Sequence, residues 1–142
     1  MKAIILYTLL IFMTLGCNET KNLKGENAMS VSLNHQSEAR NVKLTLHPSF
    51  YIMEIQGEAY RYDLDSAKWS ELNEILKKVK VENLANYTAP EIGGRFVEKE
   101  LKSQITIQNN EGEFASQIFF NSNVPEELRE LYLYLDSYFP VN

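Results

Sequence analysis

The segment LKSQITIQNNEGEFASQIFF, residues 101–120, has the residue pattern of a β-hairpin. In its first half, the residues at alternate positions are apolar or small, which is the period of a strand with one buried face. The run NNEG at 109–112 is rich in turn-forming residues, and 114–120 follows as the returning strand. Because one apolar face must be covered by another layer, this segment predicts an antiparallel sheet packed against further elements.

Four more runs with strand character precede this hairpin. Apolar residues alternate with polar ones over 29–33 and 42–46, and the polar stretch 35–41 between them is expected to form a loop. The run 50–56 (FYIMEIQ) is apolar on both faces, which predicts a central strand, and 59–64 completes the set. These runs extend the predicted antiparallel sheet to about six strands.

Two other stretches have helical spacing. Asp65 or Ser66 can cap the first of these helices. Its apolar stripe consists of Trp69, Leu72, Ile75, Leu76 and Val79. The second helix is expected to have Asn123 as cap and to stop at Pro140, with a stripe made of Leu128, Leu131, Tyr132, Leu135, Tyr138 and Phe139. The sequence therefore predicts a single α+β domain at 29–142, with the order ββββαββα and two helices packed on one face of the sheet.

The first seventeen residues, MKAIILYTLLIFMTLGC, differ in character from the rest of the chain. They begin with one positive charge at Lys2 and continue as an almost uninterrupted apolar run to Leu15. This is the arrangement of a secretory signal peptide. The run is shorter than the roughly 20 apolar residues that a membrane-spanning helix needs. We therefore expect residues 1–16 to be a signal peptide that is removed on export.

The end of this segment carries a family resemblance. The run Thr14-Leu15-Gly16-Cys17 resembles the lipobox of small bacterial lipoproteins, although Thr14 stands where that motif usually has Leu. The resemblance implies cleavage before Cys17, a diacylglyceryl thioether on its sulfur and acylation of the new N-terminus. It also implies a lipid anchor in the bacterial cell envelope, at the outer membrane and facing the periplasm or the cell surface. The alternative is a free thiol behind an ordinary signal cleavage site.

Composition and charge narrow the possible partners. Cys17 is the single cysteine, so no disulfide can form within the chain. Residues 17–28 are expected to be the lipidated cysteine and a flexible tether, because 18–28 (NETKNLKGENA) is polar throughout most of its length. Fully extended, this tether reaches roughly 35 Å. Loss of Lys2 with the signal peptide takes the formal net charge from −5 to −6, and an acidic surface argues against nucleic acid as a partner.

Motifs for catalysis or metal binding are weak in this sequence. His35 and His47 are too few for a metal site without help from carboxylates, and both are expected to be exposed in loops. Ser103 and Ser116 have neither a nucleophile-elbow motif nor a nearby histidine. We therefore expect no catalytic residue, no metal site and no cofactor, and the chain is not predicted to be an enzyme.

A surplus of apolar side chains is the most informative signal for binding. Four residues are expected on strand faces opposite the core, where they would form a candidate binding patch on the outer face of the sheet: Tyr51, Met53, Ile55 and Phe119. The alternative is that the N-terminal strands fold over and bury them. Arg95, after Gly93 and Gly94, is a further candidate for binding an anion, although a loop that needs glycine explains the same run.

Two functional classes fit these features. The helix whose apolar stripe begins at Trp69, the hairpin 101–120 and the run Pro125–Leu128 resemble the pattern of small bacterial lipoproteins, a resemblance that brings no activity with it. We expect a lipid-anchored envelope protein whose domain is a non-catalytic protein-binding or assembly module. The alternative is an immunity or inhibitor lipoprotein that neutralises a toxin or hydrolase in the envelope. In both cases the partners are a lipid bilayer and a protein.

Overall fold

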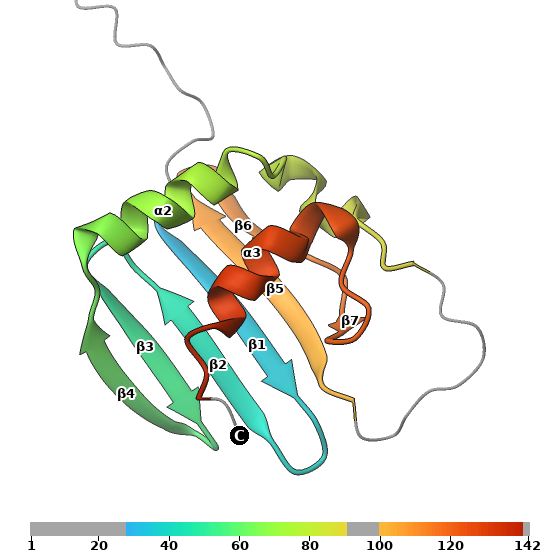
Figure 1. Ribbon diagram of the computed structural model, residues 1–142, viewed down its shortest axis with the longest axis horizontal. Coiled ribbons are helices and arrows are strands. Elements are labelled where there is room, and N and C mark those ends of the chain that lie inside the picture. The colour runs from blue at the N-terminus through green and yellow to red at the C-terminus, as the bar shows by residue number, and fades with distance from the viewer. Residues whose placement is uncertain (1–27, 91–99, 141–142) are drawn as a thin grey trace, which may run out of the picture.

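The computed structural model describes residues 28–90 and 100–140, which form one antiparallel sheet and the helices that cover it (Figure 1). Cys17 and Arg95 lie outside the described residues. The strands are β1 Ser30–Gln36, β2 Asn41–Leu46, β3 Phe50–Ile55, β4 Glu58–Asp63, β5 Lys102–Asn109, β6 Gly112–Ala115 and β7 Phe119–Phe120. The helices are α2 Ser66–Leu76 and α3 Arg129–Asp136, with two short 3-10 helices, η1 Val81–Asn86 and η2 Glu126–Leu128.

The predicted α+β class and the element order ββββαββα are confirmed. The sheet runs in the order β4-β3-β2-β1-β5-β6, and β7 pairs with the other end of β5. The strand β1 therefore lies in the middle of the sheet, and β4 forms one edge. Figure 1 shows α2 and α3 on the same face of the sheet. Within the two described ranges, no helix has the length and apolar character that crossing a bilayer requires.

The core forms between that face and the two helices. Leu33 of β1 lies opposite Leu44 of β2 and Ile105 of β5, and all three side chains are fully buried. From α3, Leu131 and Leu135 are buried against them. Burial of each such aliphatic side chain stabilises the fold by about 1.5–3 kcal/mol relative to exposure, which makes these rows the main source of stability.

The two main helices begin differently. Of the two predicted cap residues, Asp65 caps α2, since its Oδ1 accepts a hydrogen bond of 2.8 Å from the backbone N–H of Ala67. The second helix has no cap from Asn123, because the side-chain amide of that residue donates to the carbonyl oxygen of Pro90 instead. The chain then passes through η2, whose first turn follows Pro125, before α3 starts.

Two strand boundaries also differ from the prediction. The loop expected at 35–41 contains only 37–40, because β1 and β2 extend their ladder into the expected loop. The return strand expected at 114–120 is divided into β6 and β7. Ser116 causes this break, because its N–H donates to the carbonyl of Ile105 while its Oγ accepts from the N–H of Ile105 at 3.0 Å. A side chain thus replaces one backbone partner, and the ladder stops there.

Candidate functional site

A polar chain, buried at His35 and Ser103 and half-exposed at Asp136, connects the middle of the sheet to the last helix. His35 of β1 lies opposite Ser103 of β5, and its Nδ1 is 2.8 Å from the Oγ of Ser103. Its Nε2 is 3.0 Å from Oδ1 of Asp136, at the end of α3. Because a carboxylate only accepts, Nε2 carries the proton and donates to Asp136, and Nδ1 accepts from the serine hydroxyl. All three side chains are therefore joined by directed hydrogen bonds.

Burial controls the protonation of the side chains in and around this polar chain. His35 is only 4% exposed, and burial lowers the pKa of its imidazole below 6.5, with the hydrogen bond to Asp136 opposing part of that shift. The imidazole ring also packs against Phe139, with ring centroids 4.7 Å apart. Burial, together with the charge of Asp136, raises the pKa of Tyr132 to about 12. The imidazole is therefore neutral at pH 7, and its neighbours are aromatic.

The order of contacts is that of a serine hydrolase triad, in which a hydroxyl donates to one imidazole nitrogen and the other nitrogen donates to a carboxylate. Ser103 is only 1% exposed, however, so its Oγ offers no surface to a substrate. Among the described residues, no buried side-chain nitrogen or oxygen lacks a hydrogen-bond partner. The geometry is that of a satisfied polar chain that runs from the buried Ser103 and His35 to the half-exposed Asp136 and positions α3 on the sheet.

Two predictions about these residues were wrong. His35 was expected to be exposed in a loop, but it is buried in β1 because the β1–β2 ladder extends to Gln36. Ser103 was expected to have no histidine nearby, but the β1–β5 register brings His35 to it. His47 does lie in a connection, and its ring stacks on Phe50 with centroids 4.4 Å apart.

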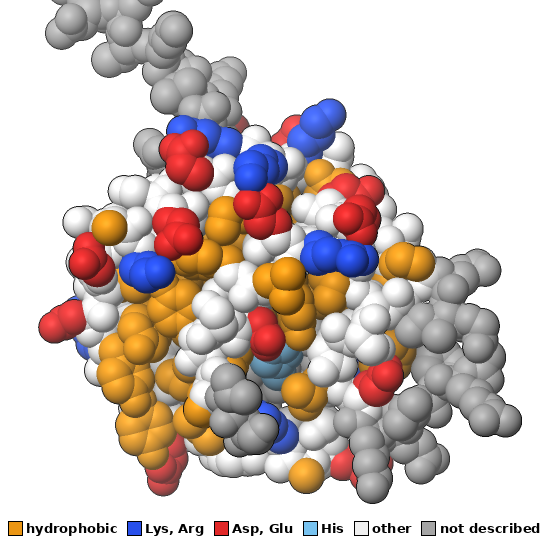
Figure 2. Space-filling view, in the orientation of Figure 1, with side chains coloured by type: hydrophobic (Ala, Val, Ile, Leu, Met, Phe, Trp, Pro, Cys, Tyr) orange, Lys and Arg blue, Asp and Glu red, His pale blue; other side chains and the backbone are white. Residues whose placement is uncertain are grey.

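A second candidate site lies on the same helix-covered face of the sheet, toward the edge formed by β4. Five of the eight tyrosines gather there and are termed the tyrosine surface: Tyr51 of β3, Tyr60 and Tyr62 of β4, Tyr134 of α3, and Tyr138 just after it. The strand register places the first three on one face, because Tyr62 lies opposite Tyr51 and Tyr60 lies opposite the buried Met53. Figure 2 shows hydrophobic side chains gathered over this flank.

Four of the five rings of the tyrosine surface contact one another in sequence. Tyr51 stacks on Tyr62 with centroids 5.0 Å apart and meets the edge of Tyr138 at 5.3 Å. Tyr134 continues the series, with its centroid 5.8 Å from that of Tyr138. Stacked and edge-to-face pairs of this kind add about 0.5–1.5 kcal/mol beyond the burial of their area. These contacts therefore hold four of the five tyrosine rings in place.

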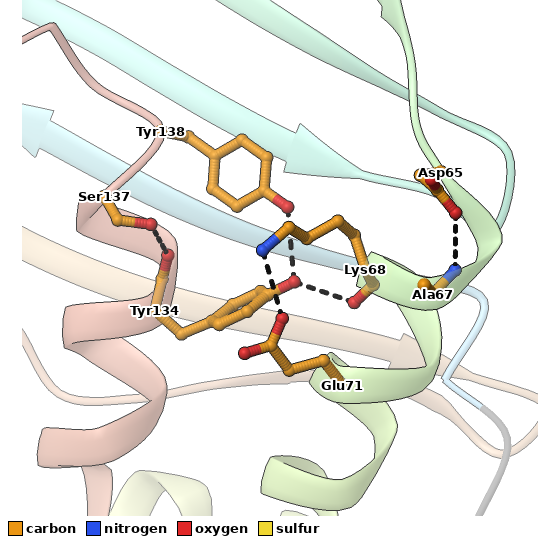
Figure 3. A network of polar contacts seen from close by, with 7 residues as sticks. All are labelled: Asp65, Ala67, Lys68, Glu71, Tyr134, Ser137 and Tyr138. Atoms are coloured by element: carbon orange, nitrogen blue, oxygen red, sulfur yellow. Dashed lines mark hydrogen bonds and ion pairs between the residues drawn. The ribbon is translucent and has the colours of Figure 1, made fainter.

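Hydrogen bonds fix the helical side of this surface (Figure 3). The hydroxyl of Tyr134 donates to the carbonyl oxygen of Lys68 in α2 at 2.7 Å and accepts from the hydroxyl of Tyr138 at 3.2 Å. Burial, followed by the hydrogen bond with Tyr138, raises the pKa of Tyr134 above 10. Lys68 forms an ion pair with Glu71 at 3.2 Å beside this contact. These bonds connect α2 to α3 at the border of the tyrosine surface.

The edge strand β4 adds unpaired backbone groups to the same surface. Every residue of β4 is exposed, and Tyr60 and Tyr62 are 43% and 47% exposed. The N–H of Leu64 donates to the carbonyl of Ser49, so the hydrogen-bonded pairs with β3 fall at every second residue from Leu64 back to Glu58. The backbone groups of the intervening residues, Ala59, Arg61 and Asp63, therefore point away from β3 at the free edge of the sheet.

The binding residues predicted from the sequence are only partly brought together. Tyr51 belongs to the tyrosine surface, and Ile55 lies at the end of β3 with 39% exposure. Met53 and Phe119 are 5% and 3% exposed, so the prediction that they lie on an outer binding face was wrong. The cause is the run 50–56, in which both faces are apolar, so its composition does not identify the side that faces the helices.

Sequence reasoning missed the tyrosines of β4 and α3 as members of a surface. A signal was present, because the YRY run at 60–62 puts two aromatic side chains on one face of a strand. What the sequence lacked was the position of β4 at the edge of the sheet. Neither helix covers that edge, as Figure 1 shows.

A shallow cleft of about 220 Å³ lies at the far end of α2 from the tyrosine surface. Its lining is partly apolar, including Leu76, Ile107 and Phe114, and its rim carries charges of both signs, including Lys80 and Glu82. Across the described ranges, no three His, Cys, Asp or Glu side chains are arranged as metal ligands would be.

Comparisons with known protein families, with curated proteins and with solved structures find no match for this chain.

Proposed function

We propose that this chain is a lipid-anchored protein of the bacterial cell envelope that binds another protein through the tyrosine surface. The anchoring part of the proposal rests on Cys17 and on the lipobox resemblance of 14–17. The binding part rests on one observation. Tyr60 and Tyr62 are exposed on an edge strand, although each is large enough to stabilise a core if it were covered.

The physical chemistry of these side chains supports the binding role. Tyrosine gives a large contact area for only two rotatable bonds, and its hydroxyl can hydrogen-bond at the border of an interface. The hydroxyl of Tyr60 already donates to Oε2 of Glu58 at 2.6 Å, which holds that ring along the strand. The rings of Tyr51 and Tyr62 stack on each other. A partner would therefore meet a rigid surface, and rigid surfaces lose less entropy on binding.

The domain is proposed to be non-catalytic. The strongest catalytic candidate, the chain Ser103–His35–Asp136, keeps its nucleophilic oxygen in the core. The cleft near α2 is smaller than the about 300–1,000 Å³ usual for small-molecule sites. Binding of a protein by a surface thus accounts for more of the described features than turnover of a substrate in a pocket.

A photo-cross-linking amino acid at Tyr60, in the full chain in its native envelope, tests this function. The matched control carries the same amino acid at Glu113 of β6, which is exposed near the opposite edge of the sheet. Apart from any second copy of the chain, we expect one envelope protein to be captured from position 60 and not from position 113. Addition of Tyr62→Ser to the position 60 variant should abolish that capture.

Equal capture from both positions, or none from position 60, would overturn the proposed binding surface. If the captured protein is a toxin or a hydrolase, its activity should be measured with the purified chain added. Inhibition that Tyr62→Ser removes would favour the inhibitor alternative over the assembly module.

A further inference from the structure

The charges on the free edge of β4 are self-complementary: a positive and a negative side chain lie on one face of the strand. Arg61 and Asp63 lie two residues apart, so their side chains share the face of the strand that is opposite the tyrosines. Among the described residues, neither forms an ion pair. The guanidinium carbon of Arg61 lies 3.7 Å from the ring centroid of Phe50, a stacking that occupies its flat face and leaves the N–H groups at its rim to donate.

From this edge we propose that β4 pairs in antiparallel orientation with β4 of a second copy of the chain, with Arg61 opposite Asp63 of that copy. The outward backbone groups of Ala59, Arg61 and Asp63 supply the ladder. A two-fold axis makes each contact occur twice, so two Arg–Asp pairs form. The proposal concerns self-association and does not depend on the proposed partner or on the lipid anchor.

The charges select this register over its neighbours. Side-chain alternation allows only registers in which one strand is shifted by two residues at a time relative to the other. A shift of one residue would place tyrosines opposite the charged side chains. One step away, Arg61 faces Arg61 of the second copy and like charges meet. A further step leaves Arg61 opposite Ala59, without an ion pair. A shift in the other direction places Asp63 opposite Asp63 of the second copy, so like charges meet there as well. Charged residues usually protect an edge from pairing, but opposite signs at this spacing favour the register with two Arg–Asp pairs.

The same register joins the two tyrosine surfaces. Tyr62 faces Tyr62 of the second copy across the two-fold axis, as a pair that is not hydrogen-bonded, for which the Cα atoms are about 4.5 Å apart. The axis is perpendicular to the sheet, so both helix-covered faces lie on the same side. Two copies would then present one continuous aromatic surface, twice as wide as that of a single chain.

The position of the chain before β1 is compatible with this pair. Val31, Leu46, Tyr51 and Tyr62 are successive neighbours across four strands. At about 4.8 Å per strand, Val31 of one copy lies about 34 Å from Val31 of the other. Each polar stretch 18–28 can extend to roughly 35 Å, so both N-terminal segments can reach one bilayer.

Cysteine cross-linking in the full chain, in its native membrane, reads the register directly. Tyr62→Cys, Arg61→Cys and Tyr60→Cys each place a thiol on the axis of one of the three registers, within disulfide range. All three are made with Cys17 retained, and the wild-type chain with the same oxidant gives the background from Cys17. We expect a disulfide-linked dimer from Tyr62→Cys and none above background from the other two. A dimer from Arg61→Cys or Tyr60→Cys would overturn the register, and no dimer from any variant would overturn the pairing.

Charge exchange provides a test that needs no new thiol. Arg61→Asp alone and Asp63→Arg alone should each lose self-association, because like charges then meet twice at the edge. The double variant should regain it. A mixture of the two single variants, each with a different tag, should form mixed dimers and no like dimers. Self-association that persists in both single variants would overturn the proposal, whereas failure of the envelope partner to bind would leave it standing.

Discussion

Nε2 of His35 and Oδ1 of Asp136 lie 3.0 Å apart although 101 positions separate them in the sequence. This contact connects the end of α3 to the middle strand of the sheet, and Ser103 completes it from β5. A polar chain at this place costs desolvation, but it specifies how the last helix sits. Its contribution to stability can be measured because His35 and Ser103 can be substituted separately.

The first prediction concerns pH. Because burial lowers the pKa of His35, the folded chain binds fewer protons than the unfolded chain does below pH 6.5. The free energy of unfolding should therefore be highest above pH 6.5 and decrease as the pH falls through that value. Urea unfolding between about pH 8 and about pH 5 measures this slope. His35→Gln should remove most of the slope, and a slope equal to that of the wild type would contradict the assignment.

A matched histidine tests whether position matters. The pKa of His47 is also lowered, first by burial and then by the charge of Arg61. His47 is less buried than His35, of which only 4% is exposed, so His47→Gln should change the slope less. A larger effect from His47→Gln would show that His35 is not the main source of the pH dependence.

Removal of the serine hydroxyl should destabilise the fold. Ser103→Ala leaves Nδ1 of the buried His35 without its donor, which costs about 1–3 kcal/mol. Ser70→Ala is the control, because its hydroxyl is exposed on α2 and bonds only within the helix. That control should stay within about 0.5 kcal/mol of the wild type in urea unfolding. Equal effects of the two substitutions would show that the polar chain adds nothing.

The tyrosine that joins the two helices gives a third test. Tyr134→Phe removes the hydrogen bond to the carbonyl of Lys68 but keeps the ring, so we expect a loss of about 1 kcal/mol. Tyr62→Phe is the control, since its ring is retained and its hydroxyl is at the exposed edge. Thermal or urea unfolding of both variants should therefore separate them, with Tyr62→Phe close to the wild type.

The hairpin that presents the tyrosine surface depends on one glycine. Gly57 has φ of +88° in the turn between β3 and β4, and no atom lies within 4 Å of a Cβ built there. Gly57→Ala should therefore cost about 1–2 kcal/mol through backbone strain alone. Gly57→Asn should cost less, because asparagine tolerates this conformation. Identical unfolding midpoints for the two variants would contradict this explanation.

The lipid anchor makes a fifth prediction. Cys17→Ala should release the chain from the membrane fraction, because no acyl chains can be attached without the thiol. Mass spectrometry of the wild-type chain should show cleavage before Cys17 and a mass increase from acylation. A variant that stays in the membrane pellet, with the signal removed, would show that another interaction holds the chain there.

Period and composition were sufficient for the local structure. The alternation in 101–108 predicted β5, and the stripe from Trp69 predicted α2 with Asp65 or Ser66 as its cap, because these patterns depend on neighbours in the sequence. Ser116 shows where that reasoning stops. Whether its hydroxyl would replace a ladder bond depends on the strand beside it, which the local pattern does not specify.

The candidate site depended on contacts between distant residues. His35 was assigned to a loop because polar residues surround it, whereas its burial follows from pairing with β2 and β5 at once. Met53 was assigned to the outer face because 50–56 is apolar on both faces. In each case the missing fact was the partner on the other side of a strand, and a single sequence specifies such partners poorly.

The central position of β1 has a mechanical consequence. Any force that pulls on the chain before Ser30 acts along β1, which is hydrogen-bonded to β2 on one side and to β5 on the other. Because the hydrogen bonds of an antiparallel ladder are perpendicular to the strands, such a pull loads both ladders in shear, and many bonds must break together. A pull on an edge strand such as β4 across the sheet would instead open its bonds one at a time. Tension applied from the N-terminal side is therefore carried by a strand that is hydrogen-bonded on both sides, while the β4 edge remains unloaded.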